Sequence, residues 1–370
     1  MRRLPITSSL ALALLACNAS RSPVTATPPT SPRARARALP AIDYMVIVAS
    51  EASDRVSRVR YGPRGIRIEQ EVAVGANPVH VNGPHGIASS PDRRFYYVTT
   101  GHGTPFGSLW KYAAASDSLV ARVPLGLFPA TVAVTPDGTL AFAVNFNLHG
   151  PHEPSSVSIV STEQMIEIAR VRTCVMPHGS RFNPQGTKHY SACMMDDRLV
   201  EIDVQSLAVS RTLDLSPHTE SRCSPTWVQP SSGGRRVFVA CNASNEIVEV
   251  DVDGWAVERR FPAGEGVYNL ATTSDGRRLV ATNKRDQSVS IVDLESGREL
   301  ARIPSSHRIV HGVVVSPDDR YAFVTAEGVG SESGAVDVLD LSTLTVVATV
   351  DVGRMTGGIE FWRLEATKLE

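Results

Sequence analysis

The chain has 370 residues, of which 42% are hydrophobic, so it is long enough to bury a large core as two domains or as one large β domain. Its formal net charge is −1, with both signs mixed along the chain. A nucleic-acid partner is therefore not expected, because such partners select for a basic stripe. Aromatic residues are few, whereas Gly (27) and Pro (24) are frequent, a balance typical of short strands joined by tight turns.

The first 17 residues have the pattern of an export signal. Arg2 and Arg3 form a basic segment, and the apolar run 10–15 that follows is too short to span a bilayer as a helix. The motif LLAC at 14–17 resembles a bacterial lipobox, which implies lipidation of Cys17 and removal of the preceding residues. Secretion without a lipid, after cleavage at another site, is the alternative.

Residues 18–40 are predicted to form a flexible tether. They consist mostly of Ser, Thr, Pro, Ala and Arg, which cannot bury enough apolar surface to offset the entropy of ordering. Asn18 differs from the aspartate that resembles an inner-membrane retention signal, which favours an outer-membrane anchor. The chain is thus expected to be exported and held at the cell envelope, facing the periplasm or the cell surface.

Residues 41–365 are predicted to form a single all-β domain built from repeats. A short apolar strand, a turn such as Ser-Pro-Asp, and a second strand recur six times, as in PHGIASSPDRRFYYVTT (84–100) and VHGVVVSPDDRYAFVTA (310–326). A third and a fourth strand follow each pair, as in IVEVDV (247–252) and VERRFPA (257–263). Four short strands per unit of about 45 residues are the signature of a propeller blade.

The starts of the first strands set the number of blades. Counting six residues back from each turn, and adding the unturned C-terminal copy, gives seven positions: His85, Ala130, His178, Ser224, Tyr268, His311 and Gly357. The N-terminal segments 44–49, 56–61 and 65–74 have no first strand before them. We therefore predict a seven-bladed β-propeller in which the C-terminal strand 357–362 completes the N-terminal blade and closes the ring.

The repeats resemble a known family. SPDRRFYYVTT, TSDGRRLVATN and SPDDRYAFVTA are similar to the YVTN-type β-propeller repeat, over about residues 44–362. Related bacterial proteins are periplasmic or surface propellers. The resemblance implies the fold and leaves the activity open, since the same shape hosts lactonases, dehydrogenase subunits and copper-enzyme domains.

A metal site at the mouth of the central channel is one hypothesis for function. His85, His178 and His311 share the ring position, and loops on the same face carry His102, Cys193 and Met194. Imidazole, thiolate and thioether groups together suit copper, and imidazole alone suits zinc or another divalent ion. The other reading is a polar channel without a metal. Glu327 and Glu332, in the loop EGVGSESG, could bind a cation on the ring face, but a flexible, solvated polar loop is the favoured interpretation.

The four cysteines after Cys17 form an even set, which in an exported protein indicates disulfides. Cys174 and Cys223 occupy similar positions before first strands, and Cys193 and Cys241 end equivalent second strands. The pairings Cys223–Cys241 and Cys174–Cys223 both remain open.

Together these features predict a lipid-anchored, monomeric binding module for a protein, glycan or small-molecule ligand. The alternative is a periplasmic propeller enzyme, either a lactonase-like hydrolase or an oxidoreductase subunit. The absence of carboxylates from the predicted histidine ring argues against the hydrolase, whose metal-bound water would need such groups.

Overall fold

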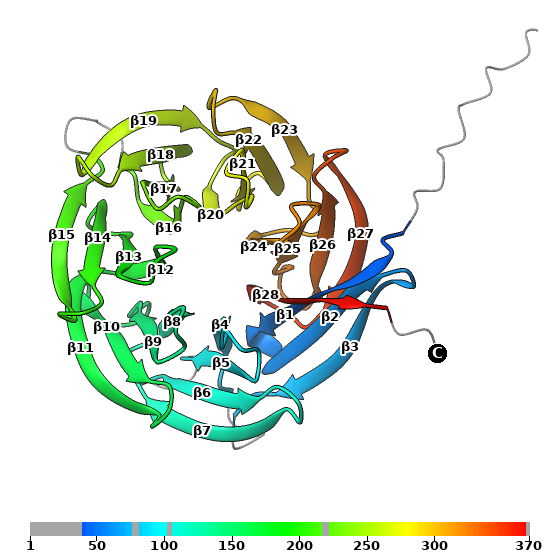
Figure 1. Ribbon diagram of the computed structural model, residues 1–370, viewed down its shortest axis with the longest axis horizontal. Helices are drawn as coiled ribbons and strands as arrows, with labels where there is room; N and C mark the ends of the chain where they lie inside the picture. The colour runs from blue at the N-terminus through cyan, green and yellow to red at the C-terminus, as the bar shows by residue number, and fades with distance from the viewer. Residues whose placement is uncertain (1–38, 76–80, 102–105, 217–221, 368–370) are drawn as a thin grey trace, which may run out of the picture. The chain divides into compact units, whose positions relative to one another are not determined.

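The structure is a computed structural model that describes residues 39–75, 81–101, 106–216 and 222–367. Cys17 and His102 lie outside these residues. Seven antiparallel four-stranded sheets stand around a central channel, and each sheet runs from an inner strand to an outer one (Figure 1). The seven-bladed β-propeller predicted from the sequence is confirmed. In the described part of the chain, no helix has the length and hydropathy that a membrane span requires.

The strands fall into four concentric sets. The inner strands, from the closing blade onward, are β28 (Thr356–Ala366), β4 (Pro84–Ser89), β8 (Pro129–Val134), β12 (Pro177–Phe182), β16 (Pro225–Pro230), β20 (Val267–Thr272) and β24 (Val310–Val315). The second strands are β1 (Ile42–Ser50), β5 (Phe95–Thr100), β9 (Leu140–Asn145), β13 (Lys188–Cys193), β17 (Arg236–Cys241), β21 (Arg278–Asn283) and β25 (Tyr321–Ala326).

The remaining strands complete each blade towards its rim. The third strands are β2 (Arg55–Gly62), β6 (Ser108–Ala113), β10 (Pro154–Ser161), β14 (Arg198–Asp203), β18 (Glu246–Asp251), β22 (Ser288–Asp293) and β26 (Gly334–Asp340). The outer strands are β3 (Gly65–Ala73), β7 (Ser118–Pro124), β11 (Ile166–Val175), β15 (Ala208–Asp214), β19 (Ala256–Pro262), β23 (Glu299–Pro304) and β27 (Thr345–Val352). A 3₁₀ turn, η1 (Glu51–Ser53), follows β1.

The ring closes where the C-terminal strand meets the N-terminal blade. β28 pairs antiparallel with β1, from Ile42 opposite Ala366 to Ser50 opposite Thr356, as predicted. Hydrophobic clusters then lie between neighbouring blades, and one of them packs Tyr44 of β1 against Tyr321 of β25. Closure leaves no inner sheet edge exposed, because every inner strand is flanked by its own blade and by adjacent blades.

The recurring turn between first and second strands explains the repeat motif. In the Ser-Pro-Asp copy at 90–92, Ser90 Oγ donates to Asp92 at 2.6 Å, and Asp92 accepts the Arg94 N–H at 3.0 Å. The next position has positive φ in all six turns, which glycine adopts without strain. It is occupied by Arg93, Gly138, Gly186, Gly234, Gly276 and Asp319.

The fourth of these turns corrects the register of its blade. Gly234 takes the glycine position, so the turn is Ser231-Ser232-Gly233-Gly234 and begins two residues later than the Pro230-Ser231 alignment assumed. The inner strand β16 accordingly starts at Pro225. Thr226, and not Ser224 as predicted, therefore holds the ring position in this blade.

Glycine after the ring histidine allows neighbouring inner strands to approach closely. A Cβ at Gly179 would lie 2.5 Å from Thr226 O, and one at Gly312 would lie 2.5 Å from Gly357 O. Threonine side chains tie the same strands together, as in the bond from Thr325 Oγ1 to Gly357 O at 2.7 Å. The His-Gly pairs thus serve the packing at the axis, as expected.

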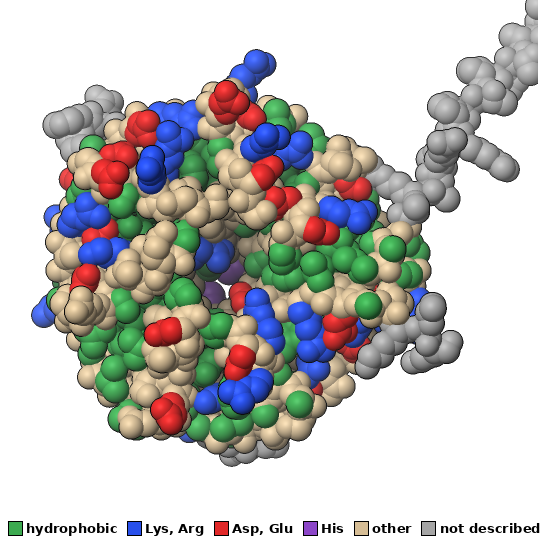
Figure 2. All heavy atoms as spheres, viewed as in Figure 1, with side chains coloured by type: hydrophobic (Ala, Val, Ile, Leu, Met, Phe, Trp, Pro, Cys, Tyr) green, Lys and Arg blue, Asp and Glu red, His purple; other side chains and the backbone are tan. Residues whose placement is uncertain are grey.

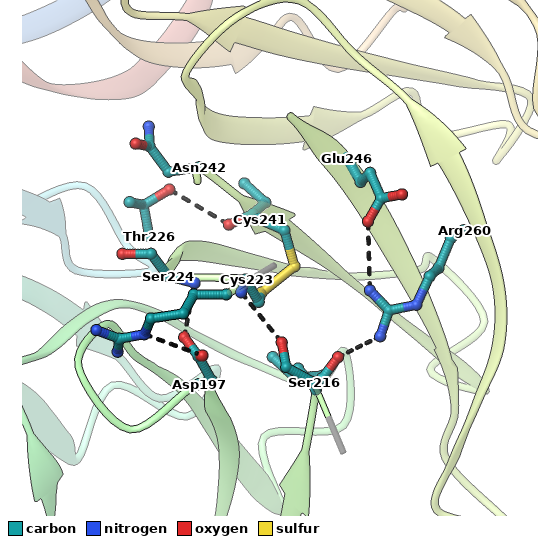
Figure 3. Close-up of a disulfide and its surroundings, with 12 residues drawn as sticks. Asp197, Ser216, Cys223, Ser224, Thr226, Cys241, Asn242, Glu246 and Arg260 are labelled. Atoms are coloured by element: carbon teal, nitrogen blue, oxygen red, sulfur yellow. Dashed lines mark hydrogen bonds and ion pairs between the residues drawn. A yellow bond between two sulfur atoms is a disulfide. The ribbon is translucent and has the colours of Figure 1, made fainter. Parts of the chain in front are cut away.

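Two disulfides join equivalent places in adjacent blades: Cys174–Cys193 and Cys223–Cys241. The second was one of the two predicted pairings, whereas Cys174–Cys223 is wrong. Figure 3 shows the second bridge, in which the backbone N–H of Cys223 also donates to Ser216 Oγ at 3.0 Å. Each bridge closes a loop of under 20 residues, which in the chain-entropy description is worth about 3 kcal/mol.

We predict that Gly179→Ala destabilises the fold by ~1–3 kcal/mol, because the new methyl group meets backbone atoms that cannot move independently. Gly233→Ala is the matched control, since a Cβ there has no neighbour within 4 Å. The free energy of unfolding from urea titration measures both. Equal stability of the two variants would contradict the close approach at the channel axis.

Candidate functional site

The second residue of each inner strand faces the top of the channel. These seven ring residues are His85, Ala130, His178, Thr226, Tyr268, His311 and Gly357. The structure brings the three predicted histidines together. The ring centroid of His85 lies 6.1 Å from that of His178 and 5.5 Å from that of His311, both edge to face. The ring of Tyr268 lies between those of His178 and His311, with centroid distances of 5.5 Å and 4.7 Å respectively.

Backbone carbonyls of the next blade fix two of these imidazoles. His85 Nδ1 donates to Ala130 O at 2.7 Å, and His178 Nδ1 donates to Thr226 O at 2.9 Å. Each neutral ring therefore carries its lone pair on Nε2, and that of His178 accepts the Tyr268 hydroxyl at 3.1 Å. His311 lies against Gly357 in the same way, but its buried Nδ1 makes no hydrogen bond of standard geometry.

Burial keeps two of the ring histidines, His178 and His311, neutral. Desolvation, reinforced by the neighbouring His85, lowers the pKa of His178 to about 3. Desolvation and the nearby Lys284 ammonium likewise hold the pKa of His311 well below its usual value. At neutral pH these two side chains act as hydrogen-bonding groups and not as cations.

Above the histidines lies a second ring, which the sequence analysis did not recognise. It consists of the residue that follows each second strand: Glu51, Gly101, Phe146, Met194, Asn242, Lys284 and Glu327. Three of its members are ionisable and lie on neighbouring or nearby blades. Their shared position after the second strand is the signal that could have identified them.

The two carboxylates of this second ring approach the imidazoles. Glu51 Oε2 lies 3.8 Å from His85 Nε2, and Glu327 Oε1 lies 3.8 Å from His311 Nε2. The ring itself has no carboxylate, as predicted, but loops at the mouth supply two, so the argument drawn from the ring against a hydrolase does not hold. Glu327 is only 16% exposed, and it is not the solvated residue that was predicted. Figure 2 shows histidine, acidic and basic side chains around the central opening.

The two carboxyl groups differ in protonation. Burial, reinforced by the charge of Glu327, raises the pKa of Glu51 to about 8. Glu327 instead accepts a hydrogen bond from Lys284 Nζ at 2.6 Å. Although burial opposes its charge, Tyr268 and Glu327 hold the pKa of Lys284 above its usual value, and Nζ lies 4.5 Å from the Tyr268 ring centroid. At neutral pH the site thus pairs one protonated carboxyl with one ion pair.

The other predicted metal ligands do not join the histidines. Cys193 is bonded to Cys174, so the thiolate expected there is wrong. Met194 packs with Phe128 and Phe146 in an apolar cluster beside the channel. Across the described ranges, no three His, Cys, Asp or Glu side chains form a group that could hold a metal ion. Binding of copper or another divalent ion remains a prediction. The set of ligands on which that prediction was based does not come together in the structure.

The geometry on this face is that of a polar, acid–base site at the channel mouth of an all-β propeller. No protein-family model matches the chain, and no curated protein matches it in sequence. The likeness to known proteins is therefore one of shape.

Solved structures share this shape at low sequence identity. A periplasmic gluconolactonase of Pseudomonas aeruginosa is 17% identical, with a TM-score of 0.70 over 88% of this chain and 99% of its own. A putative 6-phosphogluconolactonase of Bacteroides uniformis is 15% identical, with a TM-score of 0.69 over 86% of this chain and 99% of its own. A dihydro-heme d1 dehydrogenase, NirN, is 15% identical, with a TM-score of 0.60 over 90% of this chain and 78% of its own. These similarities establish the propeller fold.

We predict that Glu51→Gln stabilises the protein increasingly between pH 4.5 and 8. The folded state keeps this carboxyl protonated to about pH 8, whereas its ordinary pKa is 4.5, so the wild type loses stability as pH rises through this window. The difference amounts to roughly 1.4 kcal/mol per pH unit and vanishes below pH 4.5. Glu327→Gln, which strands Lys284, should destabilise instead. Urea unfolding across pH decides the point, and a pH-independent effect at Glu51 would contradict it.

Proposed function

We propose that the protein is an extracytoplasmic hydrolase of small lactones, working at the mouth of the propeller channel. The observation that carries the proposal is the pair of carboxyl groups, Glu51 and Glu327, each 3.8 Å from a ring imidazole, of which Glu327 is also bonded to Lys284. Burial raises the pKa of Glu51, and two carboxyl groups in such different environments are suited to act as an acid and a base. The fold shared with two proteins named as lactonases supports the same reaction class.

Hydrolysis of a lactone needs a base for water, a stabiliser for the carbonyl oxygen and an acid for the ring oxygen. The Glu327 carboxylate accepts a proton from a water molecule while the oxygen of that water bonds to the carbonyl carbon of the lactone. The Lys284 ammonium, already beside Glu327, neutralises the charge that develops on the carbonyl oxygen. Glu51 donates its proton to the ring oxygen as the ring C–O bond breaks, and the proton gained by Glu327 returns to Glu51 through solvent.

The imidazoles position these groups. His85 and His178 are fixed by carbonyls of neighbouring blades, and His178 in turn accepts the Tyr268 hydroxyl. A water between Glu51 and His85 would bridge their 3.8 Å separation and orient the carboxyl proton. The imidazoles bind and orient, whereas the carboxyls exchange protons with the substrate.

The location of the enzyme is part of the proposal. The predicted lipid anchor at Cys17 and the predicted tether 18–40 would hold the ring near a membrane. Two disulfides support an oxidising compartment, because such bridges persist outside the reducing cytoplasm.

We predict that the purified protein hydrolyses D-glucono-1,5-lactone and that Glu51→Gln and Glu327→Gln each lower kcat by at least ~100-fold. Activity should fall as pH rises past about 8, since Glu51 then loses the proton it must donate. Proton release measured at constant pH reports the rate, with the spontaneous reaction subtracted. Glu332→Gln is the matched control, because this exposed residue of the same loop pairs with Arg308 away from the ring.

The assay is repeated with a chelator and with added copper or zinc, which also tests the metal predicted from the sequence. No turnover under any of these conditions would overturn the hydrolase. If the lactone nevertheless binds saturably, the binding module predicted first from the sequence is the function that remains.

A further inference from the structure

Below the ring histidines, the channel widens into a cavity of about 260 Å³. His85 and His311 line it at the end nearer the mouth, and Ser89 and Glu360, late in their inner strands, line it further down. The walls combine apolar side chains with a few polar ones, which is the usual composition of a small-molecule site. Neither Glu51 nor Glu327 lines this cavity.

Arg181 of β12 brings a positive charge into this cavity. Its Nε is completely buried and has no hydrogen-bond partner, and its Nη2 reaches only Leu270 O, at 3.4 Å. The described residues give this guanidinium no ion pair within 4 Å. The side chain as a whole is only partly buried, but its buried Nε is left without an acceptor, so the arrangement favours an anion that the protein itself does not supply.

The one carboxylate in the cavity wall is already engaged. Glu360 Oε1 accepts the Ser89 hydroxyl at 2.7 Å and lies 3.3 Å from Arg93 Nη1. It influences Arg181 only at longer range, where it partly offsets the effect of burial, which lowers the pKa of Arg181. Arg93 and Glu360 therefore form a closed pair, and Arg181 remains available.

A second donor lies beside the guanidinium. The indole Nε1 of Trp227 is buried without an acceptor, and Arg181 lies over the indole with its Cζ 5.7 Å from the ring centroid. Asn269 also lines the cavity, and its Oδ1 accepts the Leu270 N–H at 2.8 Å, so its amide NH₂ is the donor that remains. Two unsatisfied donors and a positive charge meet in one place on three inner strands.

We propose that this cavity is a binding site for a small hydroxycarboxylate, whose carboxylate accepts hydrogen bonds from Arg181 and from Trp227 Nε1. Arginine binds a carboxylate through two parallel N–H groups, and one guanidinium matches one negative charge. A phosphate dianion fits less well, because Arg181 is the one cation among the described residues that line the cavity, and Glu360 lies in the same wall. Hydroxyl groups of the ligand find a partner in the amide of Asn269.

This proposal does not depend on the hydrolytic one. The cavity and the carboxyl pair at the mouth lie on opposite sides of the ring histidines and share no ionisable side chain other than His85 and His311. The two proposals can therefore fail separately.

The test is a titration of the purified full-length protein with sodium D-gluconate, followed by calorimetry and by the shift in melting temperature. Inorganic phosphate and sodium chloride at equal ionic strength are the competing anions. We expect saturable gluconate binding in the wild type. Arg181→Gln should weaken it at least tenfold, and Trp227→Phe, which keeps the ring and removes the N–H, should weaken it severalfold.

The unliganded variants make the result interpretable. Arg181→Gln removes a partly buried charge that has no ion pair in the cavity, so its melting temperature without gluconate should be equal to or above that of the wild type, while the gluconate-induced shift disappears. Arg94→Gln is the control for net charge, since this exposed arginine pairs with Asp92 on the surface. Glu51→Gln should retain gluconate binding, which separates this site from the hydrolytic one.

Several outcomes would overturn the proposal. It fails if gluconate produces no saturable signal, because the donors then bond only to water. It also fails if Arg181→Gln binds gluconate as tightly as Arg94→Gln does. If phosphate binds as tightly as gluconate, the cavity is a general anion site and the proposed selectivity for a hydroxycarboxylate is wrong.

Discussion

The pairing of β28 with β1 is the constraint on which the rest of the structure depends. It converts seven separate sheets into a ring and thereby fixes the distance of each inner strand from the axis. Only in a closed ring do residues more than 200 positions apart, such as His85 and His311, bring their imidazole centroids to 5.5 Å. The same closure places Gly358 against the backbone of His85, where a side chain would not fit. The chemistry of the channel is thus a consequence of how the chain ends meet.

A narrow channel lined by polar groups forces those groups to differ from one another. The interior disfavours several like charges, so burial lowers the pKa of His178 and His311 and raises that of Glu51, while Glu327 is paired with Lys284. Towards the other end, Glu360 is matched by Arg93. Arg181 is the exception to this compensation, and for that reason it marks a place for a ligand.

The sequence was sufficient to predict the architecture because the repeat turn and the strand alternation are local signals that recur. It located His85, His178 and His311 correctly, since each follows a proline or valine at a fixed distance from its turn. It misplaced one ring position, choosing Ser224 over Thr226, because the turn Ser-Ser-Gly-Gly lacks the proline used for alignment.

Other features of the site could not be predicted from the residues considered one at a time. Glu51 and Glu327 approach the ring imidazoles only because the loops of two blades, from opposite ends of the chain, meet at the mouth. The bridge between Cys174 and Cys193 was missed, although it repeats Cys223–Cys241 one blade earlier. Comparing equivalent positions across blades, more than reading each motif alone, would have exposed both.

The closing blade also determines how the ring bears mechanical load. The chain enters the described domain at β1, which is hydrogen-bonded to β28 on one side and to β2 on the other. A pull transmitted along the chain before Ile42 is therefore shared between two ladders of backbone bonds and does not peel a free edge. The strand that would receive such a force first, β1, is hydrogen-bonded to a neighbouring strand on both sides.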